Sequence, residues 1–376
     1  MALFDNLLNR KKSDTESRYY SLDSLLKENA TYNVIFGERS NGKTYAVLKH
    51  GLAEYVKHGG QLAYVRRWKE DIIGSRASDI WSALIDNGEI SKITNDEYQG
   101  VYYTSGKFYL CNYDGEGKAL YNDNDLLGFT FALSDTEHNK SISYPKVRTI
   151  IFDEFLTKGT YLRDEFVLFM NTVSTILRQR TNVKIYMLGN TVNNYSPYFD
   201  EMGLNHIREQ KQGTIEVYSY GDSKLTVAVE YTASTKSNKP NNFYYAFDNP
   251  KLNMITSGAW ELDMYPHAPI KWKPSDIMFT YFIVYYENVF QCEIIAKDDI
   301  TFTFIHEKTT PLQDPENDLI YTLDYIPKMN YNRSIYKPIN KLQEKVLWYF
   351  KSDRVYYQDN KVGNAITNYL KDCRLL

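Results

Sequence analysis

The sequence is poor in residues that could build a covalent or metal-bound framework. It has 3 cysteines among 376 residues, and Cys111, Cys292 and Cys373 lie far apart without any C-x-x-C pair. Neither a disulfide framework nor a thiolate zinc site is therefore supported. The 6 histidines include no H-E-x-x-H motif and no close pair. This composition predicts a reducing cytoplasm as the compartment.

Long apolar runs and a surplus of one charge are also absent. No segment approaches the ~18 apolar residues that span a bilayer, and the N-terminal stretch lacks the apolar core of a secretory signal. The 44 Lys and Arg residues face 47 Asp and Glu, a formal charge of -3. This balance excludes a uniformly basic surface but not a local basic patch. Residues 328–376 have ten basic and four acidic side chains, so this tail is a candidate nucleic-acid contact, although a solvated helix face also fits.

Aromatic residues are plentiful, with 34 Tyr, 18 Phe and 5 Trp, so the chain can bury a core. Over the first 200 residues, strand and helix signals alternate. Strands are expected at 32–36, 61–65, 129–133, 148–152 and 183–188, a hairpin at 101–111, and helices at 43–57 and 165–180. The alternation predicts an α/β domain over residues 1–200, with a mostly parallel sheet and helices on both of its faces.

The pattern changes near residue 200. Residues 201–275 are irregular and rich in Asn, Ser, Lys and Pro, which predicts a linker region with some β-structure at 214–220 and 224–231. Three closely spaced strand runs follow, and helical periodicity returns near residue 339. Residues 276–376 are therefore expected to form a separate α+β domain.

A glycine-containing loop joins the strand at 32–36 to the helix at 43–57. It fits the pattern G-x-x-x-x-G-K-[ST] with Gly37, Glu38, Arg39, Ser40, Asn41, Gly42, Lys43 and Thr44. The glycines let successive backbone N–H groups point at phosphate oxygens, and the helix N-terminus favours an anion. Lys43 is expected to reach the β- and γ-phosphates of ATP, and Thr44 to offer its hydroxyl to Mg²⁺. The alternative is an ordinary Gly-containing turn, which the flanking strand and helix disfavour.

An acidic pair, Asp153-Glu154, ends the apolar strand at 148–152. Asp153 is expected to hold Mg²⁺, directly or through water. Glu154 is expected to orient and deprotonate the water that attacks the γ-phosphate. The pair could instead merely begin a loop after a core strand, which the upstream phosphate loop makes the weaker interpretation.

Other polar residues follow neighbouring elements. Asn190 ends the strand at 183–188 and is a candidate to sense the γ-phosphate or position the water, or a turn former. Because the strand at 183–188 follows the strand that ends in Asp153-Glu154, the latter strand would lie inside the sheet and not at its edge. This arrangement suits the additional-strand, catalytic-glutamate class of P-loop ATPases. Arg178 and Arg180 are candidate arginine fingers for a neighbouring subunit, or cations that cap a helix C-terminus. The stretch Arg66-Arg67-Trp68-Lys69 could contact phosphate or form a solvated charged turn.

These stretches together resemble the genome-packaging (encapsidation) ATPases of small tailed phages of the phi-29 group. The resemblance is carried by residues 34–46, 64–69, 144–155, 177–180 and 189–199, in order and at similar spacing. The phosphate loop is common to many ATPases, whereas Tyr64-Val65-Arg66-Arg67 and Phe152-Asp153-Glu154-Phe155 are much more specific. The remainder of the chain matches by layout alone.

The resemblance implies an ATP-driven motor that pushes double-stranded viral DNA through the portal, or connector, into an empty prohead. It implies a homo-oligomeric ring, expected to be a pentamer, in the cytoplasm of the infected bacterial host and transiently attached to the prohead. A structural packaging RNA is a further candidate partner, and no membrane is involved.

The resemblance also implies roles for individual residues. Lys43 and Thr44 would be nucleotide ligands, Asp153 would hold Mg²⁺ and Glu154 would be the catalytic base. Arg178 and Lys140 would be catalytic residues that act on a neighbour's nucleotide. Arg66 would lie near the nucleotide lid, and Lys69 would face DNA in the channel.

The C-terminal domain, by the same resemblance, looks like a ribonuclease-H-type nuclease that has lost its metal site. The expected strand at 279–286 has no internal acidic residue, and Glu293 has no partners at metal-ligand spacing. Two-metal cleavage needs several converging carboxylates. A non-nucleolytic domain that docks to the portal, structural RNA or DNA is therefore expected.

Two alternatives remain open on the sequence. A helicase-like single-strand translocase would need aromatic stacking platforms, and the sequence around Lys69 offers only Trp68. A non-hydrolysing, nucleotide-dependent assembly switch would not need a base beside Asp153, so the presence of Glu154 argues against it.

Overall fold

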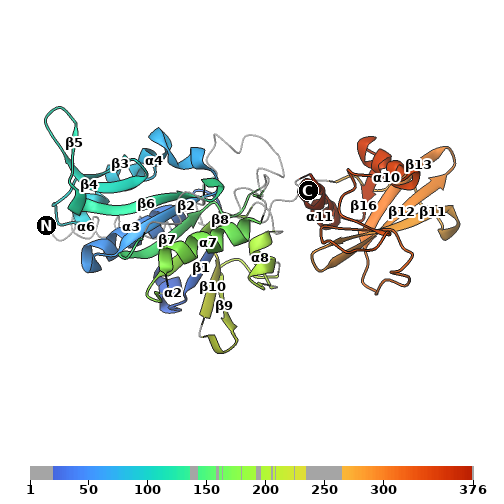
Figure 1. The fold of residues 1–376 in the computed structure, drawn as a ribbon, viewed down its shortest axis with the longest axis horizontal. Coiled ribbons are helices and arrows are strands. Elements are labelled where there is room, and N and C mark those ends of the chain that lie inside the picture. Colours follow the sequence, from blue (N-terminus) through green and yellow to red (C-terminus); the bar gives the residue numbers. More distant parts are fainter. Residues whose placement is uncertain are drawn as a thin grey trace, which may run out of the picture. The chain divides into compact units, whose positions relative to one another are not determined.

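The computed structural model describes residues 20–135, 143–157, 161–162, 164–178, 180–191, 196–204, 206–207, 209–223, 225–233 and 265–374. The chain divides into two compact units, residues 1–260 and 261–376. Each unit is built around its own β-sheet (Figure 1).

The first unit contains a 10-stranded sheet in the order β3-β4-β6-β2-β7-β8-β1-β10-β9, with β5 paired to β4. Its strands are β1 (Tyr32–Gly37), β2 (Gln61–Arg66), β3 (Gly100–Thr104), β4 (Lys107–Tyr113), β5 (Ala119–Leu120), β6 (Leu126–Ala132), β7 (Val147–Asp153), β8 (Lys184–Asn190), β9 (Thr214–Tyr220) and β10 (Leu225–Tyr231). The run from β6 to β10 is parallel throughout, and antiparallel pairs occur only towards the two margins. The predicted mostly parallel sheet is confirmed.

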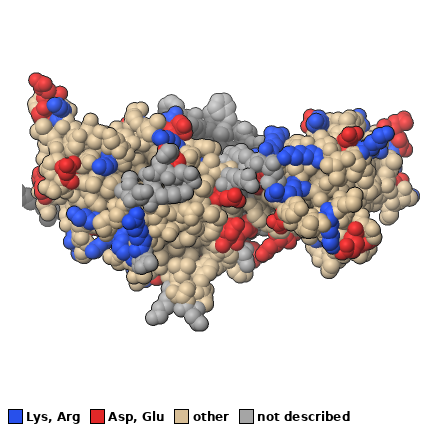
Figure 2. All heavy atoms as spheres, in the orientation of Figure 1, with Lys and Arg blue, Asp and Glu red and all other residues tan. Residues whose placement is uncertain are grey.

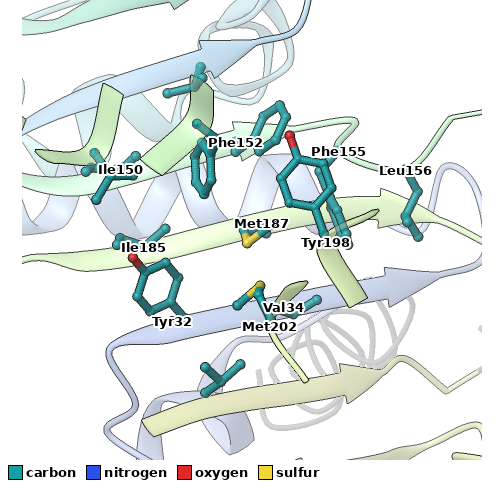
Figure 3. Packing of buried hydrophobic residues seen from close by; sticks show 14 of the residues in the cluster. Tyr32, Val34, Ile150, Phe152, Phe155, Leu156, Ile185, Met187, Tyr198 and Met202 are labelled. Atoms are coloured by element: carbon teal, nitrogen blue, oxygen red, sulfur yellow. The ribbon is translucent and has the colours of Figure 1, made fainter. Parts of the chain in front are cut away.

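Helices cover both faces of this sheet. They are α2 (Asp23–Lys27), α3 (Lys43–His58), α4 (Gly74–Asp79), α5 (Ser82–Asp86), α6 (Glu89–Ile93), α7 (Glu165–Leu177) and α8 (Pro197–Glu201), with short 3₁₀ turns at Lys69–Ile72, Asp123–Asp125 and Gly221–Ser223. Ile35 of β1 faces the core that α3 completes, whereas Val34 faces the core that α7 and α8 complete (Figure 3). Alternate residues of one strand thus enter two separate cores, which explains why the central strands read as continuous apolar runs.

The strand order places β8 between β1 and β7, so the acidic-pair strand is inside the sheet, as expected. The structure differs from the linker predicted over residues 201–275. There β10 pairs with β1 and β9 pairs with β10, so both strands belong to the first sheet. β-structure is expected at both places, but the polar composition of the segment hid its membership of the first sheet, where buried Val227 and Val229 anchor β10 in the core.

The second unit has a six-stranded sheet in the order β15-β14-β11-β12-β13-β16. Its elements are β11 (Ile277–Tyr285), β12 (Asn288–Lys297), β13 (Ile300–Glu307), β14 (Ile320–Thr322), β15 (Tyr331–Asn332), α10 (Lys341–Lys351), β16 (Val355–Tyr357) and α11 (Asn360–Cys373). The expected three-strand meander is β11-β12-β13, which is antiparallel. Across the part of the chain that the structure describes, no helix has the length and apolar character needed to cross a bilayer.

Candidate functional site

The sequence-predicted residues meet at the carboxyl ends of four adjacent parallel strands. Gly37 ends β1, Arg66 ends β2, Asp153 ends β7 and Asn190 ends β8. The register pairs Gly37 with Asn190, so the phosphate loop begins directly beside that amide. This edge of an open parallel sheet is where such folds bind ligands.

Two glycines and an anchored side chain shape the phosphate loop. Gly42 precedes α3 with φ 92°, and Gly37 has φ 153°. A Cβ on Gly37 would lie 2.0 Å from the Thr232 hydroxyl oxygen, so no other residue fits there without displacing that segment. Asn41 Nδ2 donates to the same hydroxyl at 3.0 Å. The loop is therefore held against the chain that leaves β10, while Arg39 and Ser40 are exposed at its tip.

Lys43 is buried in the loop with 6% of its surface exposed. Its Nζ donates to the Glu38 carbonyl at 2.6 Å and to the side-chain oxygens of Asn41 at 3.1 Å and Asn190 at 3.4 Å. Burial lowers the Lys43 pKa to about 8, although Asp153 and Glu38 oppose that shift. The hydrogen bonds of this ammonium all go to neutral oxygens, and a phosphate group would add a directly bound anion.

Asp153 accepts two hydrogen bonds on one carboxylate oxygen. Thr44 donates to Asp153 Oδ2 at 3.1 Å, and Tyr64 donates to the same atom at 2.7 Å. Tyr64 lies in β2 and is almost fully buried, which raises its pKa well above the ordinary value and keeps the hydroxyl protonated. We did not predict Tyr64 as a site residue, because an apolar strand containing a tyrosine gives no sign of which strand lies beside it.

Glu154 lies in a strained position beside Asp153. Its backbone has φ 57°, in the left-handed region that a residue with a side chain rarely adopts. Arg66 Nη2 contacts Glu154 Oε2 at 2.7 Å, and the same guanidinium lies 3.5 Å from Asp71 and 3.9 Å from Asp153. In this arrangement the predicted base is held by Arg66 rather than by the phosphate loop.

The neighbouring Arg67 is buried and faces away from solvent. Arg67 Nε contacts Glu165 Oε2 at 2.7 Å, and its Nη atoms donate to the carbonyls of Glu154 at 3.2 Å and Phe155 at 2.7 Å. Tyr198 donates to the other oxygen of Glu165 at 2.7 Å. Of the three cations expected to contact phosphate, Arg67 is thus committed to the protein interior.

The remaining candidates lie elsewhere. Lys69 has 57% of its side chain exposed and forms an ion pair with Asp135 at 2.6 Å. Arg178 is exposed just beyond α7, with φ 41°. Arg180 instead donates to four backbone carbonyls, those of Tyr144, Val147, Ile176 and Leu177, which suits a structural role. Lys140 lies outside the described residues.

The donor set fits a nucleotide with its metal ion. Thr44 and Asp153 offer adjacent oxygen ligands, which Mg²⁺ prefers, and the metal would complete its shell with phosphate and water. No cluster of three or more His, Cys, Asp or Glu that could hold a metal ion occurs among the residues with described positions. A metal site built from protein ligands alone is therefore not seen in that part of the chain. Thr44 and Asp153 instead form the pair of oxygen ligands typical of phosphate loops.

Comparisons with known proteins agree with this geometry. The profile of the family described as Podovirus DNA encapsidation protein (Gp16) matches residues 14–218. A DNA packaging protein of Bacillus phage B103 is 31% identical over 185 residues, which cover 48% of this chain and 50% of that protein. That of Bacillus phage phi29 is 29% identical over 187 residues, covering 49% and 50%. The matched segment thus spans about half the length of these curated relatives.

Two solved structures share the fold over nearly the whole chain. One, described as the bacteriophage Phi-29 viral genome packaging motor assembly, has a TM-score of 0.58 and 20% identity, and covers 95% of this chain and 100% of that chain. The other, described as the Phi-28 gp11 DNA packaging motor, has a TM-score of 0.54 and 17% identity, with 96% and 99% covered. Because the family profile matches more than half of its residues, this chain belongs to the Podovirus DNA encapsidation protein (Gp16) family.

Proposed function

We propose that this protein is the ATPase of a viral DNA-packaging motor, which hydrolyses ATP to move double-stranded DNA through a portal into a prohead. The observation that carries the proposal is the meeting of Lys43, Thr44 and Asp153 at one sheet edge, with Thr44 and Asp153 3.1 Å apart. The position of β8 between β1 and β7 supports assignment to the additional-strand, catalytic-glutamate class.

The residues at the sheet edge have separate tasks. Backbone N–H groups of the phosphate loop and the Lys43 ammonium bind the phosphates, and Asn190 orients the terminal one. Thr44 and Asp153 would hold Mg²⁺, which neutralises phosphate charge. Glu154, once released from Arg66, takes a proton from the attacking water. The contact at 2.7 Å keeps that carboxylate away from the nucleotide until then.

The expected assembly is a homo-oligomeric, pentameric ring attached to the prohead in the host cytoplasm. Arg178 and Lys140 would act on the nucleotide of a neighbouring subunit. The exposure of Arg178 and its position directly after the end of α7 support this role. Lys69 remains a proposed DNA contact within the ring.

For the second unit we propose a ribonuclease-H-type fold without nuclease activity. The antiparallel meander β11-β12-β13 supports the fold. Glu293 is engaged by Gln291 at 2.8 Å and by His306 at 3.5 Å instead of by other carboxylates. This unit would dock to the portal, to structural RNA or to DNA.

Phosphate release by the full-length protein, with and without duplex DNA, tests the proposal. Glu154→Gln should keep nucleotide affinity and lose turnover by about 100-fold or more, as expected for a general base. Glu116→Gln, an exposed change of the same kind in the turn between β4 and β5, serves as the matched control. Rapid steady-state hydrolysis by a folded Glu154→Gln protein would contradict the assigned role.

A further inference from the structure

The amino ends of the parallel strands form the edge of the first sheet opposite the phosphate loop. Basic side chains reach this edge from α2, α3, β7, β8 and the loop that leads into β8. We call it the amino-end edge, and its basic residues are Lys27, Lys57, Lys146, Arg148, Arg180 and Lys184. Figure 2 shows Lys and Arg side chains gathered at the lower left of the first unit, on the side where Figure 1 shows α2.

Contacts between neighbouring segments hold these residues together. The Gln61 N–H donates to the Lys146 carbonyl at 2.8 Å, so the turn after α3 lies against the start of β7. A Cβ on Gly60 would lie 2.9 Å from the Arg148 side chain, so the glycine leaves room for that arginine. The Arg180 guanidinium donates to the carbonyl that precedes Arg148, at 2.6 Å.

Lys146 and Arg148 form no ion pair within the described part of the chain. Acidic residues of the described segments do lie at the same edge, Glu54 in α3 and Asp123 and Asp125 before β6, but no ion pair joins them to Lys27, Lys57, Lys146 or Arg148. Burial, together with the charge of Arg148, lowers the pKa of Arg180. The opposite edge differs, because Arg66, Arg67 and Lys69 each pair with a carboxylate.

Helix ends account for part of this charge but not all of it. Lys27 and Lys57 lie in the last turns of α2 and α3, where a cation is favourable in its own right. Lys146 immediately precedes strand β7 and Arg148 is its second residue, so no helix dipole favours either cation. The positive charge that helix ends do not explain, and that an external anion could bind, therefore lies mainly on these two residues.

We propose that the amino-end edge binds the phosphate backbone of duplex DNA. The proposal deepens the proposed function, since it names a surface with which the protein holds its cargo, but it does not depend on ATP hydrolysis. Arg180 and Lys184 already donate to backbone oxygens, so the contact would be made mainly by Lys146 and Arg148. Lysine and arginine side chains suit backbone phosphates, and such contacts carry no base information.

DNA affinity of the full-length protein, measured by fluorescence anisotropy over a range of salt concentrations without nucleotide, tests the proposal. The double variant Lys146→Gln/Arg148→Gln should bind duplex DNA about tenfold more weakly. Its slope of log affinity against log salt should fall by about 2, because each lost phosphate contact removes about 0.9. The control Lys92→Gln/Lys118→Gln removes the same charge from exposed positions elsewhere and should change neither value.

Four outcomes would overturn the proposal. Unchanged DNA affinity and salt slope, or a wild-type protein that does not bind duplex DNA, would exclude this surface. Loss of binding to duplex RNA alone would assign it to RNA, and loss of ATP turnover with intact DNA binding would assign it to a neighbour's nucleotide. Melting temperatures and the single variant Lys146→Gln, whose side chain is exposed, separate these effects from misfolding. A protein that binds DNA here but hydrolyses no ATP would refute only the proposed function.

Discussion

Arg67 and Glu165 form a buried ion pair, with Arg67 Nε 2.7 Å from Glu165 Oε2, that joins the end of β2 to the start of α7. The same guanidinium binds the carbonyls of Glu154 and Phe155. The ion pair therefore fixes the backbone of Glu154, the predicted catalytic base, through its carbonyl and that of Phe155.

We expect Arg67→Met and Glu165→Leu, made singly, to destabilise the protein by about 3–5 kcal/mol, because each leaves a buried charge without its partner. The double variant should recover part of that free energy of unfolding, since an apolar pair can replace a buried ion pair. Turnover should stay low in the double variant, because the carbonyl of Glu154 remains unsupported. Chemical denaturation and steady-state kinetics measure the two effects.

The same variants distinguish positioning from stability. A positioning role lowers kcat and leaves nucleotide KM nearly unchanged. Val173→Ala, in the buried face of α7, provides a destabilised control without a change in the ion pair. If kcat recovers together with stability in the double variant, Arg67 and Glu165 serve the fold alone.

The buried Lys43 predicts a dependence of stability on pH. Its pKa falls from 10.5 to about 8 in the folded protein. Burial of the charged form therefore costs stability below about pH 8, and this cost is relieved as the pH rises from 8 to 10.5, where the unfolded chain binds more protons. Lys43→Met should stabilise the nucleotide-free protein at pH 7 by about 1–3 kcal/mol. Denaturation at pH 7 and pH 9.5 should show the advantage of the variant shrinking, and a constant difference would refute the explanation.

Tyr64 predicts a metal-dependent phenotype. Tyr64→Phe removes the hydroxyl that orients the Asp153 carboxylate, so the Mg²⁺ concentration for half-maximal hydrolysis should rise about tenfold. Nucleotide affinity measured without metal should not change. Tyr186→Phe removes another buried hydroxyl, from β8 on the same face of the sheet, and is the control. Equal effects in the two variants would show that Tyr64 acts through packing.

Two neighbouring arginines should behave differently. Arg180→Ala should destabilise the protein by about 2–4 kcal/mol, because it leaves four carbonyls without their donor. The exposed Arg178→Ala should change stability by about 0.5 kcal/mol or less and abolish turnover in the proposed ring. Mixing it with Glu154→Gln subunits should restore some hydrolysis if Arg178 acts in trans. Verified mixed rings without any rescue would exclude trans-action.

Sequence reasoning located the parts of the site that depend on local pattern. The phosphate loop and the acidic pair follow strands whose apolar runs are continuous, and parallel topology then brings their ends together. Contacts that depend on which strands are neighbours could not be predicted in this way. Tyr64 meets Asp153, and Asn41 meets Thr232, through strand order and register alone. Thr232 follows β10, a strand that the polar composition of its surroundings had assigned to a linker.

Arg67 illustrates a second limit. Its neighbours in sequence, Arg66 and Lys69, are partly or largely exposed, and nothing in the local pattern distinguishes the buried cation from the other two. The difference arises because strand residues alternate between faces, and the turn after β2 directs Arg67 towards Glu165, 98 residues further along the chain.

The left-handed backbone at Glu154 sets stability against the proposed catalytic activity at one residue. Glycine or asparagine would relax this turn, since both tolerate such angles better than glutamate. Selection for stability alone would therefore favour loss of this carboxylate, whereas the catalytic role proposed for Glu154 would favour keeping it. By the proposed role, a homologue with glycine or asparagine at this position should keep the fold and lack ATP hydrolysis.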